Sequence, residues 1–167
     1  MELVREVFAH VCGSSNVWSV GGEMLPFCQR CTGLYVGCFA AVSAYLAFRP
    51  KPTSGLLWLH GALLVGMIPF GYHWVSQNDL VRTVTGFLFA CGIVFYLLLM
   101  PLARWCAPAR ERHELTLGFL VLSLVSLLAA VSYGGTWAAA IISFLGFVGL
   151  MCFVALLGVS AWCLVRT

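Results

Sequence analysis

Two cysteines separated by two residues are the part of this sequence best suited to chemistry. The segment Cys28-Gln29-Arg30-Cys31 places two sulfur atoms within reach of one metal ion or of each other. It lies where an apolar stretch begins, and the backbone N–H groups at a helix start, together with Arg30, would stabilise thiolates. Both metal binding and disulfide exchange require thiolates, so the segment predicts one of these two roles.

A further cysteine and a histidine precede this pair. Adding Cys12 and His10 to Cys28 and Cys31 gives three cysteines and one histidine, a composition common in closed tetrahedral zinc sites. The spacing of His10 and Cys12 is tight for two ligands of one ion, and the alternative is that His10 is a surface residue of a short helix. We therefore predict Cys12, Cys28 and Cys31 as ligands, with His10 as a candidate fourth ligand.

Polar residues gather again before the third apolar stretch. If this second polar segment lies on the same side of the membrane as the cysteines, the two segments meet over the mouth of the helix bundle. The alternative is a hydrated turn in which Asp79 caps the next helix and pairs with Arg82. The members of the segment are His73, Ser76, Gln77, Asn78, Asp79 and Arg82.

The composition predicts the surroundings of these groups. Of the 167 residues, 62% are hydrophobic and 9% are charged, far below the roughly 25% charged residues of an ordinary soluble domain. A soluble domain of this size exposes too much surface to hide so much apolar area. The lipid bilayer is therefore the predicted partner, and a net charge of +3 spread over loops does not indicate nucleic-acid binding.

Apolar stretches define the expected helices. A helix of about 20 residues crosses the roughly 30 Å of hydrocarbon in a bilayer. The uncharged run 115–165 is too long for one crossing, and Tyr133-Gly134-Gly135-Thr136 supplies a turn near its middle. We predict an all-α polytopic membrane protein whose residues 32–167 form a bundle of about five transmembrane helices. The expected spans are about 32–48, 54–72, 83–103, 115–133 and 137–165.

The first 31 residues differ in kind from this bundle. The segments Gly13-Ser14-Ser15-Asn16 and Gly21-Gly22 are loop signals. Residues 1–31 are therefore expected to form an irregular, cysteine-rich extracytoplasmic cap. Loops held by a rigid scaffold often carry functional sites.

Other features of the spans predict how helices pack. The G-x-x-x-G of Gly33-Leu34-Tyr35-Val36-Gly37 and the pair Gly86 and Ala90 suit close helix contact, and Pro69 would kink or end the second span. His60 is costly in lipid, so it is expected to face a cavity or partner, or to be a neutral imidazole bonded to a neighbouring helix. Cysteines within the spans are expected to act as small hydrophobes; they are Cys38, Cys91, Cys152 and Cys163.

Basic residues predict the orientation of the chain. With five spans, three of the nine Lys and Arg residues (Arg5, Arg30 and Arg82) fall on one side and six on the other. Positive charges resist translocation. The N-terminus is therefore expected outside and the C-terminus in the cytoplasm, in the inner (cytoplasmic) membrane.

The residues around the cysteine pair resemble a known family. The segment Pro26-Phe27-Cys28-Gln29-Arg30-Cys31-Thr32-Gly33-Leu34-Tyr35-Val36-Gly37 is similar to the signature P-x-C-x-R-C-T-G-x-Y-x-G of DUF2085, a prokaryotic integral membrane family of unknown function. In that family a Cys-His-Gln precedes the signature, and segments similar to D-G-x-T-Q and R-x-x-T-G follow it. The resemblance covers about the first ninety residues and implies that the cap, the outer loop and the first three helices form one unit.

Three segments of this chain correspond to those flanking motifs. Cys12 matches the upstream cysteine, His73-Trp74-Val75-Ser76-Gln77 resembles the second motif with His in place of Asp, and Arg82-Thr83-Val84-Thr85-Gly86 fits the third. Gly13 and Ser14 stand where the family has His and Gln. The resemblance therefore leaves two alternatives: His10 or His73 replaces the missing histidine, or the site has changed in this chain.

Three classes of function remain open from the sequence. The first is a membrane protein whose outer Cys/His site binds zinc or another transition metal in a structural, transport-related or catalytic role. The second is a thiol-disulfide oxidoreductase in which the C-x-x-C passes electrons to a quinone. An odd set of three cysteines near a histidine favours the metal site. The third is an accessory subunit, with other membrane proteins or a second copy as partners.

Overall fold

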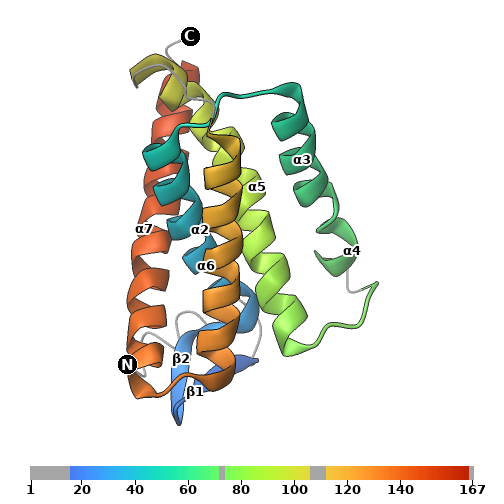
Figure 1. Cartoon of the computed structure of the whole chain (residues 1–167), viewed down its shortest axis with the longest axis vertical. Helices are drawn as coiled ribbons and strands as arrows, with labels where there is room; N and C mark the ends of the chain where they lie inside the picture. Colours follow the sequence, from blue (N-terminus) through green and yellow to red (C-terminus); the bar gives the residue numbers. More distant parts are fainter. Residues whose placement is uncertain (1–15, 72–73, 106–111, 166–167) are drawn as a thin grey trace.

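Antiparallel helices with a β-hairpin at one end make up the molecule (Figure 1). The computed structural model describes residues 16–71, 74–105 and 112–165. The elements in chain order are β1 (Val17–Val20), β2 (Glu23–Cys28), α2 (Gln29–Phe48), α3 (Ser54–Val65), α4 (Ile68–Gly71), α5 (Asp79–Trp105), α6 (His113–Tyr133) and α7 (Thr136–Val165). Helices α2, α5 and α7 run away from the hairpin, and α3 and α6 run back towards it.

Four helices of the described chain are long and apolar enough to cross a membrane. They contain the predicted spans 32–48, 83–103, 115–133 and 137–165, and the turn predicted within 133–136 separates α6 from α7. The expected all-α polytopic membrane fold is confirmed. The four candidate spans are Gln29–Phe48, Asp79–Leu99, His113–Tyr133 and Thr136–Val165.

The second predicted span, 54–72, is not one continuous helix. Helix α3 has 12 residues, which rise about 18 Å and fall short of the roughly 30 Å hydrocarbon core. It stops at Val65 because Pro69 has no N–H to donate to the Val65 carbonyl, and Gly66 closes the helix with its N–H on Ala62 O. The short helix α4 follows, and residues 49–78 still carry the chain between the two ends of the bundle (Figure 1).

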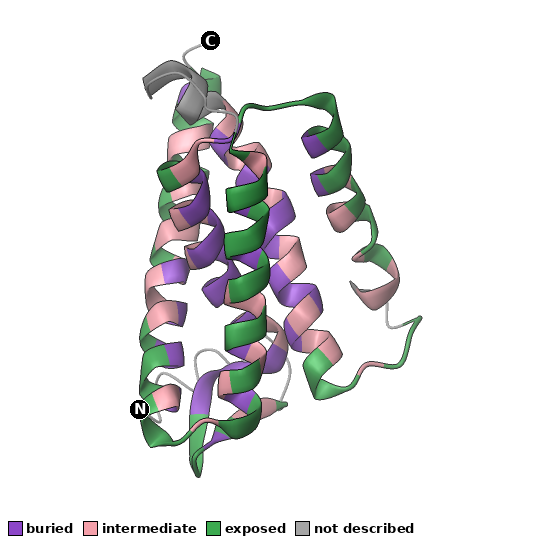
Figure 2. Ribbon diagram, viewed as in Figure 1, coloured by how far each residue is buried: buried purple, intermediate pink, exposed green. Residues whose placement is uncertain are grey.

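Helix α2 is the centre of the packing. Its buried side chains face α5, α6 and α7, whereas α6 and α7 turn apolar faces outwards (Figure 2). Exposed side chains on these outer faces include Val121 and Leu122 of α6 and Phe144 and Met151 of α7. Continuous apolar faces of this kind are unfavourable in water and are expected against lipid.

Glycines bring the backbones of three helices into direct contact. A Cβ atom built on Gly33 of α2 would lie 2.0 Å from the Thr83 carbonyl oxygen, and one on Gly86 of α5 would lie 2.2 Å from the Arg30 carbonyl oxygen. The same construction on Gly149 of α7 meets the Tyr35 carbonyl oxygen at 1.8 Å. The predicted close contact at Gly33 and Gly86 is confirmed, and it is a reciprocal crossing of α2 and α5.

His60 holds α3 against this core. It is 1% exposed, and its Nε2 lies 2.5 Å from the Tyr45 hydroxyl of α2 while its Nδ1 lies 2.7 Å from the Leu56 carbonyl oxygen. The carbonyl can only accept, so Nδ1–H donates to Leu56 and Nε2 accepts from Tyr45. The ring also stacks on Phe95 of α5 with centroids 4.1 Å apart. Of the predicted alternatives, an imidazole bonded to a neighbouring helix is the one observed.

The described part of the predicted irregular cap contains a β-hairpin, whose pairing changes register once, between Val17 and Ser19. Residues 17–28 form an antiparallel hairpin in which Val17 is opposite Cys28 and Val20 is opposite Glu23. Gly21 and Gly22 form its two-residue turn with φ of 58° and 83°, values that fit a type I′ turn and that side chains disfavour. A Gly-Gly pair between short β-forming segments is a hairpin signal, and the prediction of irregular structure was wrong here.

Candidate metal centre

The cysteine pair lies at the junction of the hairpin with α2. Cys28 is the last residue of β2 and the N-cap of α2, and its Sγ accepts a hydrogen bond from the Cys31 N–H at 3.4 Å. Cys28 is buried and Cys31 is half-buried. The Cys31 N–H group is directed at the Cys28 sulfur atom, at the positive end of the α2 dipole. The local fold therefore places the two cysteines together at the N-terminus of α2.

The strand before the hairpin turn, β1, begins beside this pair. The Gln29 N–H donates to the Asn16 carbonyl oxygen at 3.0 Å, which extends the β1–β2 pairing by one step. On the other side, the Thr32 hydroxyl donates to the Cys28 carbonyl oxygen at 3.1 Å. Asn16, the first described residue, therefore lies beside the C-x-x-C.

Arg30 joins the cysteine pair to the second polar segment. Its Nη2 donates to the Gln77 Oε1 at 2.7 Å and to the Phe70 carbonyl oxygen at 3.1 Å. The Gln77 amide Nε2 also donates to the Phe70 carbonyl oxygen, at 2.6 Å. The predicted meeting of the two polar segments at one end of the bundle is confirmed. Phe70 and Gln77 lie on either side of His73 in the sequence.

Thr83 forms a second link between the hairpin, α2 and α5. The Trp18 indole N–H donates to its hydroxyl oxygen at 2.8 Å, and that hydroxyl lies 3.2 Å from the Gln29 carbonyl and 3.1 Å from the Asp79 carbonyl. Thr83 is fully buried, so these partners satisfy a hydroxyl that would be costly to bury alone. The motif that begins at Arg82 thus has a structural role at the end of the bundle.

The start of α5 differs from the predicted hydrated turn in its capping residue and in its ion pair. The Asn78 side chain, rather than that of Asp79, caps the helix, because its Oδ1 accepts the Val81 N–H at 2.8 Å. Asp79 lies in the first turn, where a negative carboxylate interacts favourably with the positive end of the helix dipole. The Asp79–Arg82 ion pair of that alternative is not among the contacts within residues 16–71, 74–105 and 112–165.

The predicted ligands are only partly placed. Cys28 and Cys31 lie together at the start of α2, whereas His10, Cys12 and His73 lie outside the described residues. The described residues alone contain no group of three His, Cys, Asp or Glu side chains that could hold a metal ion. Two cysteines therefore form half of the tetrahedral donor set that the sequence predicts.

Sequence reasoning missed the role of the two residues between the cysteines. Arg30 is the link to Gln77, and Gln29 is 4% exposed with its Oε1 lacking a hydrogen-bond partner in the part of the chain that the structure describes. A buried acceptor of this kind is uncommon. Two polar residues inside a C-x-x-C at a membrane boundary were the available signal. The partners of Arg30, however, are 40 and 47 residues away in the sequence.

Comparisons with known proteins agree with the fold and with the segment that carries the site. Curated proteins and solved structures give no match to this chain. A family model described as a predicted membrane protein, DUF2085, matches residues 14–96. This range contains the hairpin, the C-x-x-C, the Arg30–Gln77 contact and the glycine crossing of α2 and α5. Residues 14–96, just under half of the chain, therefore match the DUF2085 family of predicted membrane proteins.

Proposed function

We propose that this membrane protein holds a zinc ion at the hairpin end of its bundle. Cys28 and Cys31 supply two thiolate ligands, Cys12 supplies a third, and either His10 or His73 completes a tetrahedral set. The observation that carries the proposal is the convergence on the C-x-x-C of the two chain segments that lead to the remaining candidates.

Chain length is compatible with this ligand set. Cys12 precedes Asn16 by four residues, and Asn16 is bonded to Gln29. His73 follows Phe70 by three residues, and Phe70 is bonded to Arg30. An extended chain covers at most about 3.6 Å per residue, so three or four residues reach about 11–14 Å. Both segments can therefore bring a ligand to the sulfur pair.

The surroundings of the cysteines suit a metal with thiolate ligands. Three thiolates and a neutral histidine around Zn²⁺ carry a net negative charge, and Arg30 places a guanidinium between the two cysteines in the sequence. Four protein ligands leave no open coordination position, which is the arrangement of structural rather than catalytic zinc. We infer that the metal fastens the N-terminal segment and the 70–78 loop to the start of α2.

Metal analysis combined with thiol titration tests the proposal on purified protein. We expect about one zinc ion per chain and thiols that react after a chelator removes the metal, because metal-bound thiolates are protected until release. Protein without stoichiometric metal, containing a Cys28–Cys31 disulfide that is reduced together with quinone turnover, would instead support the oxidoreductase. Metal that appears only together with a copurifying membrane protein would support the accessory subunit.

We propose further that the hairpin end faces the outside of the inner membrane. The end of the bundle opposite the hairpin carries most of the basic residues, including Arg49 and Lys51, and such loops stay in the cytoplasm. Glu23 at the hairpin tip and Lys51 are both exposed. In intact cells, a membrane-impermeant thiol reagent is expected to label Glu23→Cys but not Lys51→Cys, relative to the unsubstituted protein. Labelling of Lys51→Cys alone would reverse the orientation.

A further inference from the structure

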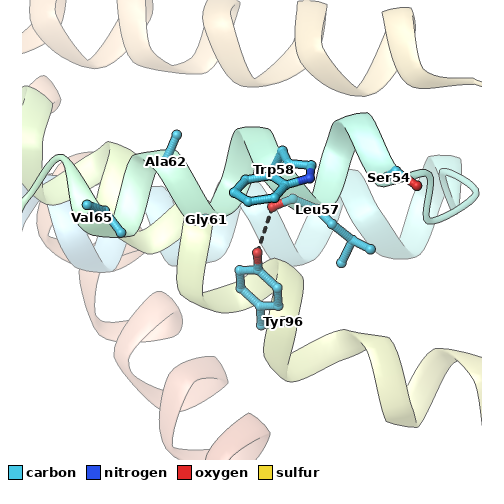
Figure 3. Close-up of a pocket in the computed structure, with 7 residues that line it drawn as sticks. All are labelled: Ser54, Leu57, Trp58, Gly61, Ala62, Val65 and Tyr96. Carbon is cyan, nitrogen blue, oxygen red and sulfur yellow. Dashed lines mark hydrogen bonds between the residues drawn. The ribbon is translucent and has the colours of Figure 1, made fainter.

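A groove runs along one face of α3, away from the candidate metal centre. Its volume is about 580 Å³, within the range of small-molecule sites. Its walls come from Leu57, Trp58, Gly61 and Val65 of α3 and from Tyr96 of α5 (Figure 3). The α3 positions recur every three or four residues, so they form one continuous stripe along the helix.

The polar hydroxyl in the middle of this groove already has a hydrogen-bond partner within the protein, so a ligand there can be apolar. The Tyr96 hydroxyl, which reaches from α5 towards α3 (Figure 3), donates to the Leu57 carbonyl oxygen at 2.6 Å. Gly61 leaves space at the bottom of the groove, because a side chain there would project towards Tyr96: a Cβ atom would lie 3.1 Å from the Tyr96 hydroxyl oxygen. Trp58 is 80% exposed over the same stripe. A flexible hydrocarbon chain fits such a surface.

One end of the groove is polar and lies at the start of α3, where basic residues are close in the chain. It ends at Ser54, the first residue of α3, and the exposed Lys51 precedes Ser54 by three residues. Arg49 and Arg112 lie at the same end of the bundle, with Glu114 as the acidic residue there in the described chain. An occupant with an apolar tail and a negative head matches this distribution of charge.

We propose that the groove between α3 and α5 binds an anionic phospholipid, with an acyl chain along the stripe of α3 and the phosphate beside Lys51. The groove lies on the surface of a membrane protein and joins an apolar wall to a cationic end, which is the chemistry of such a lipid. A second copy of the chain or another helix would bury Trp58 but would not require the cationic end. The site does not depend on the proposed metal centre.

Trp58 reports occupancy of the groove directly. In detergent-solubilised protein, brominated phosphatidylglycerol and brominated phosphatidylcholine are titrated separately, and the Trp58 signal is obtained as the difference from Trp58→Phe. We expect phosphatidylglycerol to quench Trp58 at lower mole fraction than phosphatidylcholine. Lys51→Gln should weaken the phosphatidylglycerol response on the order of fivefold, the effect of about one basic residue near a lipid phosphate.

A variant whose own side chain occupies the groove provides the second experiment. Gly61→Leu is expected to remove saturable quenching of Trp58, because the side chain occupies the floor of the groove. Gly118→Leu on α6, where a Cβ atom meets nothing within 4 Å, should leave it unchanged. Equal quenching by the two lipids, or an unchanged response in Lys51→Gln, would overturn the proposal. A dimer in which neither lipid reaches Trp58 would assign the groove to a second copy.

Discussion

Cys28→Ser and Cys31→Ser are each expected to lower bound zinc from about one ion per chain to near zero. A tetrahedral thiolate site rarely survives the loss of a ligand, because metal binding and local folding are coupled. In Cys28→Ser the Sγ that caps α2 and accepts the Cys31 N–H is also removed, whereas Cys31→Ser leaves that cap intact. Elemental analysis of protein purified under identical conditions measures the result.

Cysteines inside the spans provide matched controls for this loss. Cys38 is fully buried in α2 and Cys152 is half-buried in α7, so their replacement by Ser tests thiol removal without touching the C-x-x-C. Zinc should remain bound in both variants. Retention of a full equivalent of zinc in Cys28→Ser and Cys31→Ser would exclude these residues as ligands.

The histidine ligand is identified by the same measurement. His10→Ala and His73→Ala are compared, and only one of them should weaken binding strongly, because a tetrahedral site with three cysteines accepts one histidine. Loss of zinc in Cys12→Ser is expected alongside it. Full binding in both histidine variants would mean that the fourth ligand is another group.

Gly149→Ala is expected to have the largest effect on stability. The added methyl group would lie 1.8 Å from the Tyr35 carbonyl oxygen, and a backbone atom in the centre of α2 cannot move aside as a flexible side chain does. We expect the free energy of unfolding to fall by about 3 kcal/mol or more, the upper end of the cost of overpacking. Unfolding in mixed micelles, followed by circular dichroism, measures the change.

Gly158 on the same helix is the matched control. A Cβ atom there meets nothing within 4 Å, and replacing glycine by alanine within a helix gains up to about 1 kcal/mol of helix propensity. Gly158→Ala should therefore leave stability unchanged or raise it. Equal stability of Gly149→Ala and the unsubstituted protein would show that α2 and α7 do not pack as described.

Long apolar runs sufficed to predict most of the helices. The boundaries of α6 follow from the absence of charge after Glu114 and from the Gly134–Gly135 turn. The break after Val65 was only half predicted: Pro69 indicated a kink, yet the apolar character of 54–72 suggested a full span. Hydropathy measures the cost of transfer into lipid and does not register a missing backbone hydrogen bond.

The candidate site was also predicted only in part. The spacing of Cys28 and Cys31 predicted metal binding or disulfide exchange, because the type and spacing of two nearby side chains can be read directly from the sequence. The pairing of Arg30 with Gln77 was not predicted. It joins residues 47 positions apart, and which of several polar groups Arg30 meets depends on how closely α2 and α5 approach at Gly33 and Gly86.

By itself the sequence determined the apolar helices of a membrane protein and the presence of a cysteine pair at a helix start, since these depend on composition and local periodicity. Only the tertiary structure showed that α2 is the central helix. It also showed that Thr83 accepts a hydrogen bond from the Trp18 indole and that His60 is hydrogen-bonded to Tyr45. Contacts of this kind are set by steric fit between distant segments. A glycine allows the backbones to touch, and the polar groups brought into register there must then find partners, because an unpaired group is costly in a membrane.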